Sequence, residues 1–152
     1  MWWAVIGAAL WVGGTVFMFT VINPQWSQDP PDSVSQFFLH TQFNKYIGHF
    51  FGPPFMVFRS LLPQLLAVIL GWNQEKFRPY LLAALSCTVV AIAITLFYIY
   101  PLNEVLMLRG GGGVDALTIQ RMTKHWLIAD RIRFAISLFG FIRLLKAFRL
   151  PL

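Results

Sequence analysis

The side chains best suited to chemistry lie near the C-terminal end of this sequence, where an acid and a base occur inside an apolar stretch. At helical spacing, Trp126, Asp130, Arg133, Ser137 and Gly140 share one stripe. A charged side chain within a bilayer costs about 2.5–3.5 kcal/mol on insertion scales, so it usually faces a partner or a cavity inside the protein. An Asp and an Arg held there can transfer a proton or stabilise a developing negative charge. This stripe is therefore the first candidate site.

The composition indicates that membrane helices must position these residues. The chain has 152 residues, of which 57% are hydrophobic and 12% are charged, whereas soluble domains average about 25% charged. The net charge of +6 is spread over helix ends and loops and forms no basic face, so we expect no nucleic-acid partner. Cys87 is the single cysteine, which excludes an intrachain disulfide and a cysteine-based metal site.

The apolar runs predict an all-α protein, an integral membrane four-helix bundle built as one domain over residues 1–152. A membrane helix needs about 20 largely apolar residues. We predict four spans of about this length, at residues 2–22, 53–72, 81–100 and 126–146. Residues 33–46 carry apolar and polar side chains on opposite sides of a helical pattern, which predicts an interfacial helix in the first long loop.

Prolines and one acid are expected to mark the helix ends. Asn23-Pro24 should end the first span, and the run from Pro101 to Glu104 should close the third. Pro63 should kink the second span in its middle. Asp115 is expected to cap a helix that runs toward Trp126. Four spans place both termini on one side, and a small excess of Lys and Arg there favours the cytoplasm, with the inner membrane as location if the protein is bacterial.

This topology brings polar residues from several helix ends to one side of the membrane. If the bundle closes in the usual way, these residues surround a pocket for a lipophilic molecule with a planar or polar head, reached from the bilayer. In the alternative, Asp130, Arg133, Arg59 and Glu104 pair with one another as a structural plug. The residues brought together are Asn23, His49, Arg59, Tyr98, Tyr100, Asn103, Glu104, His125, Trp126, Asp130 and Arg133.

The three histidines do not form a metal-binding pattern. None of His40, His49 and His125 has another histidine three or four residues away. All of them lie at or outside the edges of the predicted spans, whereas a haem between two helices needs a histidine well inside each. We therefore assign no metal ligand and expect no cofactor, and a metal- or haem-binding electron carrier is the third alternative for function.

At Pro101-Leu102-Asn103, followed by Trp126 and then by the run from Asp130 to Arg133, the chain resembles the anthrone-oxygenase-like family of small four-helix membrane proteins. In that family a Pro-Leu-Asn element closes the third span, and a Trp followed by an Asn-His-Val-Arg-like element opens the fourth. The resemblance covers about residues 95–140. Asp130 and Arg131 stand where the family has Asn-His, so His125 from the neighbouring turn is the candidate replacement for that histidine.

The resemblance implies a membrane-embedded oxidoreductase or oxygenase that acts without a prosthetic group on a lipophilic aromatic, such as an anthrone or a quinol. An Arg and an Asn would stabilise the phenolate or enolate oxygen, a His or Asp would remove a proton, and Tyr and Trp would hold the ring. The alternative is a non-catalytic small subunit of a larger membrane complex, whose partners are other membrane subunits besides the lipid bilayer. The catalytic candidates are Arg133, Asp130 and His125, and the substrate-binding candidates are Asn103, Trp126, Tyr98 and Arg59.

Overall fold

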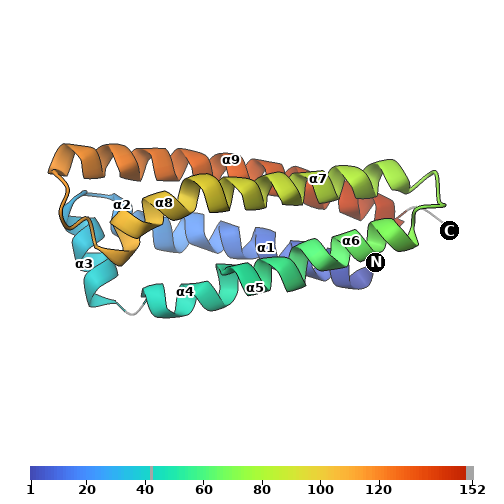
Figure 1. Ribbon diagram of the computed structural model, residues 1–152, viewed down its shortest axis with the longest axis horizontal. Helices are drawn as coiled ribbons and strands as arrows, with labels where there is room; N and C mark the ends of the chain where they lie inside the picture. Colours follow the sequence, from blue (N-terminus) through green and yellow to red (C-terminus); the bar gives the residue numbers. More distant parts are fainter. Residues whose placement is uncertain (42, 150–152) are drawn as a thin grey trace.

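All regular structure in the described part of the chain is helical, which confirms the all-α class. The computed structural model describes residues 1–41 and 43–149. Four long helical stretches lie side by side, and one short helix lies across one end of them (Figure 1). The first stretch begins, and the last stretch ends, at the opposite end of the molecule, where the rings of Trp2 and Phe148 are 4.5 Å apart.

Three of the long stretches combine α-helical and π-helical turns, the latter labelled η. The first stretch consists of α1 (Trp2–Phe17), η1 (Met18–Ile22) and α2 (Asn23–Ser27). The second consists of α4 (Phe43–Phe51), α5 (Pro53–Phe55), η2 (Met56–Leu61) and α6 (Leu62–Leu70). The third consists of α7 (Arg78–Ile94), η3 (Thr95–Ile99), α8 (Tyr100–Asn103) and η4 (Glu104–Leu108). The fourth is the uninterrupted α9 (Ala116–Arg149), and the short crossing helix is α3 (Asp32–His40).

Three of the π-helical segments end close to a proline, with one residue between the end of the segment and the proline. These prolines are Pro24, Pro63 and Pro101. A proline has no N–H to donate and its ring collides with the carbonyl four residues earlier, so an ordinary α-helix breaks or bends there. The wider π-turn inserts one extra residue, which lets the helix continue past the proline. The predicted helix ends at Asn23-Pro24 and at Pro101–Glu104 are therefore wrong, because the helices continue to Ser27 and Leu108.

Within residues 1–41 and 43–149, three helices are long and apolar enough to cross a membrane: Trp2–Ser27, Lys45–Leu70 and Arg78–Leu108. They contain most of the first three predicted spans. The fourth predicted span, 126–146, lies within α9, which carries too many charges to be counted with these three. At 1.5 Å per residue its 34 residues extend about 51 Å, which exceeds the roughly 30 Å of a hydrocarbon core.

Of the segment 33–46, in which an interfacial helix is predicted, only the first part forms a separate helix, and its position at a membrane surface stays a prediction. α3 ends at His40, and Thr41 has extended backbone with φ −98° and ψ 151°. The hydroxyl of Thr41 donates to the carbonyl of Phe37 at 2.6 Å, a local bond that competes with helix continuation. Phe43 already begins α4, so the end of the predicted segment belongs to the second long stretch.

Two buried clusters occupy the two ends of the molecule. At the terminal end small side chains let the helices approach closely: a Cβ at Gly7 would lie 1.7 Å from the carbonyl oxygen of Arg59. At the other end the buried cluster is aromatic, and Trp26, Phe38 and Trp126 lie in it. Buried polar side chains lie close to this aromatic end.

Candidate functional site

The acid and base of the α9 stripe face the interior of the protein and form an ion pair. Arg133 Nη2 donates to Asp130 Oδ1, and the two residues are 6% and 0% exposed. Their spacing of three residues places both on the same side of α9. A charge removed from solvent needs a partner and further hydrogen bonds to offset its desolvation. The predicted inward orientation of both side chains is confirmed.

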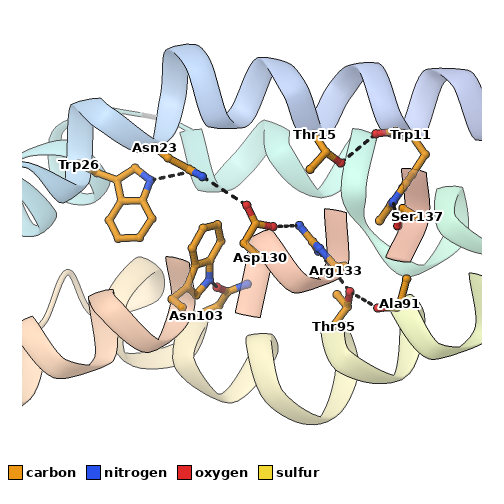
Figure 2. Close-up of polar contacts among 11 residues, drawn as sticks. Trp11, Thr15, Asn23, Trp26, Ala91, Thr95, Asn103, Asp130, Arg133 and Ser137 are labelled. Carbon is orange, nitrogen blue, oxygen red and sulfur yellow. Dashed lines mark hydrogen bonds and ion pairs between the residues drawn. The ribbon is translucent and has the colours of Figure 1, made fainter. Parts of the chain in front are cut away.

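Two polar residues on other helices hold this pair in place (Figure 2). Asn23 Nδ2, at the start of α2, donates to Asp130 Oδ2 at 3.3 Å. Arg133 Nη1 donates to Thr95 Oγ1 at 3.2 Å, and this hydroxyl in turn donates to the carbonyl of Ala91 at 2.8 Å. The result is a polar line from α2 through α9 to η3, fixed by three separate elements of the chain.

Each carboxylate oxygen of Asp130 already accepts one hydrogen bond from the protein. One oxygen accepts from Arg133 and the other accepts from Asn23, which itself accepts a bond from Trp26 Nε1 at 3.4 Å. Asp130 also does not line the neighbouring cavity. In this geometry Asp130 orients the guanidinium of Arg133, and its predicted role in proton transfer stays a prediction.

A cavity of about 130 Å³ lies beside Arg133. Its polar lining comes from Thr95, Tyr100, Asn103 and Arg133, and its remaining wall is apolar. The other lining residues are Met18, Phe43, Ile47, Gly48, Phe51, Gly52, Ile99, Met107 and Trp126. Such a mixture of mostly apolar walls with a few polar groups is typical of sites for small lipophilic molecules.

The polar groups of the cavity are only partly satisfied by the protein. Trp126 Nε1 donates to Asn103 Oδ1 at 2.6 Å, which fixes the amide and leaves its Nδ2 as a donor. Arg133 Nε is buried and has no hydrogen-bond partner within the described residues. A buried donor without a partner costs about 1–3 kcal/mol, so this atom is a natural contact for an acceptor oxygen.

The remaining members of the stripe have structural partners. Trp11 Nε1 donates to Ser137 Oγ at 3.3 Å, and the guanidinium carbon of Arg133 lies 5.6 Å from the centre of the Trp11 ring. A Cβ at Gly140 would lie 2.8 Å from Cβ of Cys87, so this glycine allows α7 and α9 to approach closely. These contacts stabilise the helix arrangement and do not add groups to the cavity.

Tyr98 and His125 lie outside this cavity. Tyr98 Oη and His125 Nδ1 are 3.5 Å apart, and both side chains are exposed. They line a separate open groove of about 440 Å³, whose other residues are Ile94, Ile128, Ala129 and Ile132. The predicted single pocket is therefore wrong with respect to these two residues.

Arg59 and Glu104 are also separate from the ion pair. The guanidinium carbon of Arg59 lies 4.4 Å from the ring centre of Phe55 and 5.1 Å from that of Phe50. Glu104 pairs with Arg109 at 2.7 Å on the surface. The four-residue plug considered from the sequence thus reduces to Asp130 and Arg133, supported by Asn23 and Thr95.

Of the polar residues of the site, Thr95 is the one that the sequence analysis did not place at the pocket. Asn23 and Tyr100 belong to the polar set at the predicted helix ends, but no motif distinguishes them there. Thr95 is one turn beyond Ala91 in an apolar helix, and only its position opposite α9 shows its function. No three His, Cys, Asp or Glu side chains come together as a metal site in the part of the chain that the structure describes.

Comparison with known proteins gives one match. The family model described as anthrone oxygenase matches residues 43–143, about two thirds of the chain. The match runs from the start of α4 to Arg143 in α9 and includes every lining residue of the 130 Å³ cavity except Met18. No curated protein and no solved structure matches the chain significantly.

Proposed function

The chain belongs to the anthrone oxygenase family, and from this premise we propose that it is a membrane oxygenase-like protein that binds a lipophilic aromatic molecule beside Arg133. One observation carries the proposal: the buried guanidinium of Arg133 lines a largely apolar cavity and has an unpartnered Nε. An enolate or phenolate oxygen of the ligand would satisfy this donor.

In this proposal the four long stretches form an integral membrane bundle. The three apolar helices supply three spans, and α9 supplies the fourth because its Asp130 and Arg133 are buried against the other helices. The cavity lies nearer to the end opposite the termini, where the lipophilic molecule enters from the bilayer. Both termini are placed in the cytoplasm, where Arg143, Lys146 and Arg149 follow the positive-inside bias.

For an anthrone as substrate the reaction balances without a further reductant. The methylene carbon loses two hydrogens and gains one oxygen atom from O₂, and the second oxygen atom leaves as water with those hydrogens. Removal of the first proton gives an enolate, and we assign the binding of its oxygen to Arg133 Nε and Asn103 Nδ2, two donors without a protein partner described above. Preorganised donors at such an oxygen commonly contribute about 10²–10³ in rate.

Tyr100 is the group to which we assign proton transfer. Among the described residues that line the cavity, Tyr100 and Arg133 are the ionisable ones. Asp130 is occupied by two hydrogen bonds, and His125 lies in the other groove. In this proposal the neutral phenol of Tyr100 acts as a proton donor toward the oxygen atom that leaves as water.

Oxygen consumption tests the proposal. Purified protein in detergent is given anthrone, and uptake of O₂ is compared between the wild type, Arg133→Ala and Arg131→Ala. Arg131 is a matched control because it is two residues away on the same helix and exposed. We expect loss of the protein-dependent rate in Arg133→Ala alone. Equal rates in wild type and Arg133→Ala would end the proposal.

The second candidate is a non-catalytic subunit of a membrane complex. The observation that favours it is the closed hydrogen bonding of Asp130, which suits a structural ion pair as well as a site. Purification in a mild detergent separates the two candidates. A stoichiometric partner together with absence of anthrone-dependent oxygen uptake supports the subunit.

A further inference from the structure

We propose that Gly48 determines the width of the molecule that the cavity accepts, an inference that rests on the ligand site proposed above. α4 provides one wall of this cavity through Phe43, Ile47, Gly48 and Phe51. At helical spacing Ile47, Gly48 and Phe51 lie on the same side of α4. Between two large side chains, this wall therefore has one position without a side chain.

Aromatic contacts hold α4 at its beginning. The ring of Phe43 lies 5.3 Å from that of Phe37 and 6.2 Å from that of Phe38, both in α3. Phe38 is itself buried against Trp26 at 5.4 Å. Such ring pairs stabilise a protein beyond the effect of their buried area alone. The start of the wall is thus anchored to the aromatic cluster.

The end of α4 is held against α1. The rings of Phe51 and Trp11 are 5.3 Å apart, and a Cβ at Gly14 would lie 2.4 Å from Cε1 of Phe50. The helix is therefore fixed at both ends, and the space beside its middle depends on the side chains that the middle carries. The two middle positions that line the cavity are Ile47, which has a large side chain, and Gly48, which has none.

Neither the backbone nor the neighbouring atoms require glycine at position 48. A Cβ there would meet no atom within 4 Å, and the residue is not among the glycines with positive φ. Gly52 is different, because a Cβ there would lie 2.1 Å from the carbonyl oxygen of Gly48. Glycine within a helix weakens it relative to alanine. Gly48 is itself exposed, and its missing side chain leaves open space where α4 borders the cavity.

A substitution series measures this effect on ligand binding. Anthrone is the wide probe, with three fused rings, and hydroquinone is the narrow probe, with one ring. Affinities for both are measured with the full chain in detergent for the wild type, Gly48→Ala and Gly48→Leu. Gly13→Leu is the matched control, because a Cβ at this exposed glycine of α1 also meets no atom within 4 Å and Gly13 lines no described cavity.

We expect Gly48→Leu to weaken anthrone binding about tenfold or more and hydroquinone binding by less than about threefold, with Gly48→Ala between. Gly13→Leu should leave both affinities unchanged. If the wild type and Gly48→Leu bind anthrone with equal affinity, the inference is overturned and the proposed site remains intact. Failure of the wild type to bind either probe overturns the site and the inference together.

Discussion

Arg133 and Thr95 join α9 to the π-helical turn η3 through one buried hydrogen bond of 3.2 Å. The residues are 38 positions apart in the chain, and the bond fixes the end of the guanidinium that is not paired with Asp130. The orientation of the Arg133 guanidinium therefore depends in part on the hydroxyl group of Thr95, which lies in a largely apolar helix segment.

Thr95→Val should destabilise the protein because it leaves Arg133 Nη1 buried without its acceptor. The expected loss in free energy of unfolding is about 1–3 kcal/mol. Denaturation in detergent measures it, and Thr20→Val is the control, since Thr20 is exposed and its hydroxyl donates only to Val16 in its own helix. A loss of equal size in both variants contradicts the role given to Thr95.

Removal of one member of the ion pair should cost more than removal of both. Asp130→Leu leaves a buried guanidinium without its counter-charge, for which we expect a loss of about 3–5 kcal/mol. Asp130→Leu combined with Arg133→Met should recover most of this loss, because apolar replacements carry no uncompensated charge. The four unfolding free energies of the cycle check this prediction. Additive losses in the double variant would show that the two residues are not energetically coupled.

Tyr100→Phe should lower the rate of anthrone-dependent oxygen uptake by about 10²-fold if the phenol transfers a proton. Tyr98→Phe should change it by less than about threefold, since Tyr98 lines the outer groove and not the cavity. The two tyrosines are close in sequence, so effects on helix stability are matched. Identical rates in the two variants, or a larger loss in Tyr98→Phe, would assign the chemistry to the groove.

The cap at the start of α9 should weaken in acid. Asp115 accepts from the hydroxyl of Thr118 at 2.7 Å and from its amide at 3.0 Å, and these bonds, the hydroxyl first, lower the pKa of Asp115. Because the folded pKa lies below the unfolded value, the stabilisation is complete above the unfolded pKa and is lost as pH falls through the folded pKa.

Amide hydrogen exchange at Thr118 measures this loss. Protection should decrease on acidification below about pH 4 in the wild type. In Asp115→Asn, which has no carboxylate to protonate, this pH-dependent decrease should be absent. Persistence of the same decrease in Asp115→Asn would place its cause in another group.

The orientation of α9 follows from its sequence, but the arrangement of the third stretch does not. Buried charge must find partners, so helical spacing is sufficient to turn Asp130 and Arg133 inward together. The same spacing sets His125 about 100° away from that stripe, and the structure places it in the outer groove. Both outcomes need only the regular period of one helix.

Tyr98 and Tyr100 show why the rest of the site could not be predicted in this way. The π-turn η3 inserts an extra residue, so every side chain after Thr95 points in a different direction from that of a regular α-helix. Proline at 101 marks where a helix is disturbed, but it does not say whether the chain ends, bends or forms a π-turn there. Contacts with α9 decide this, and they depend on residues distant in sequence.

The polar line from Asn23 to Thr95 also has a consequence for biogenesis. In the proposed bundle the last helix carries a pair of charges whose further hydrogen-bond partners are in helices made earlier. This helix is therefore poorly suited to enter the bilayer from the translocon by itself. Its integration is expected to wait for the preceding segments and to proceed as a joint assembly step. In a ribosome-bound chain in which Asn23 is replaced by alanine, α9 would then remain outside the bilayer, where a protease can cleave it.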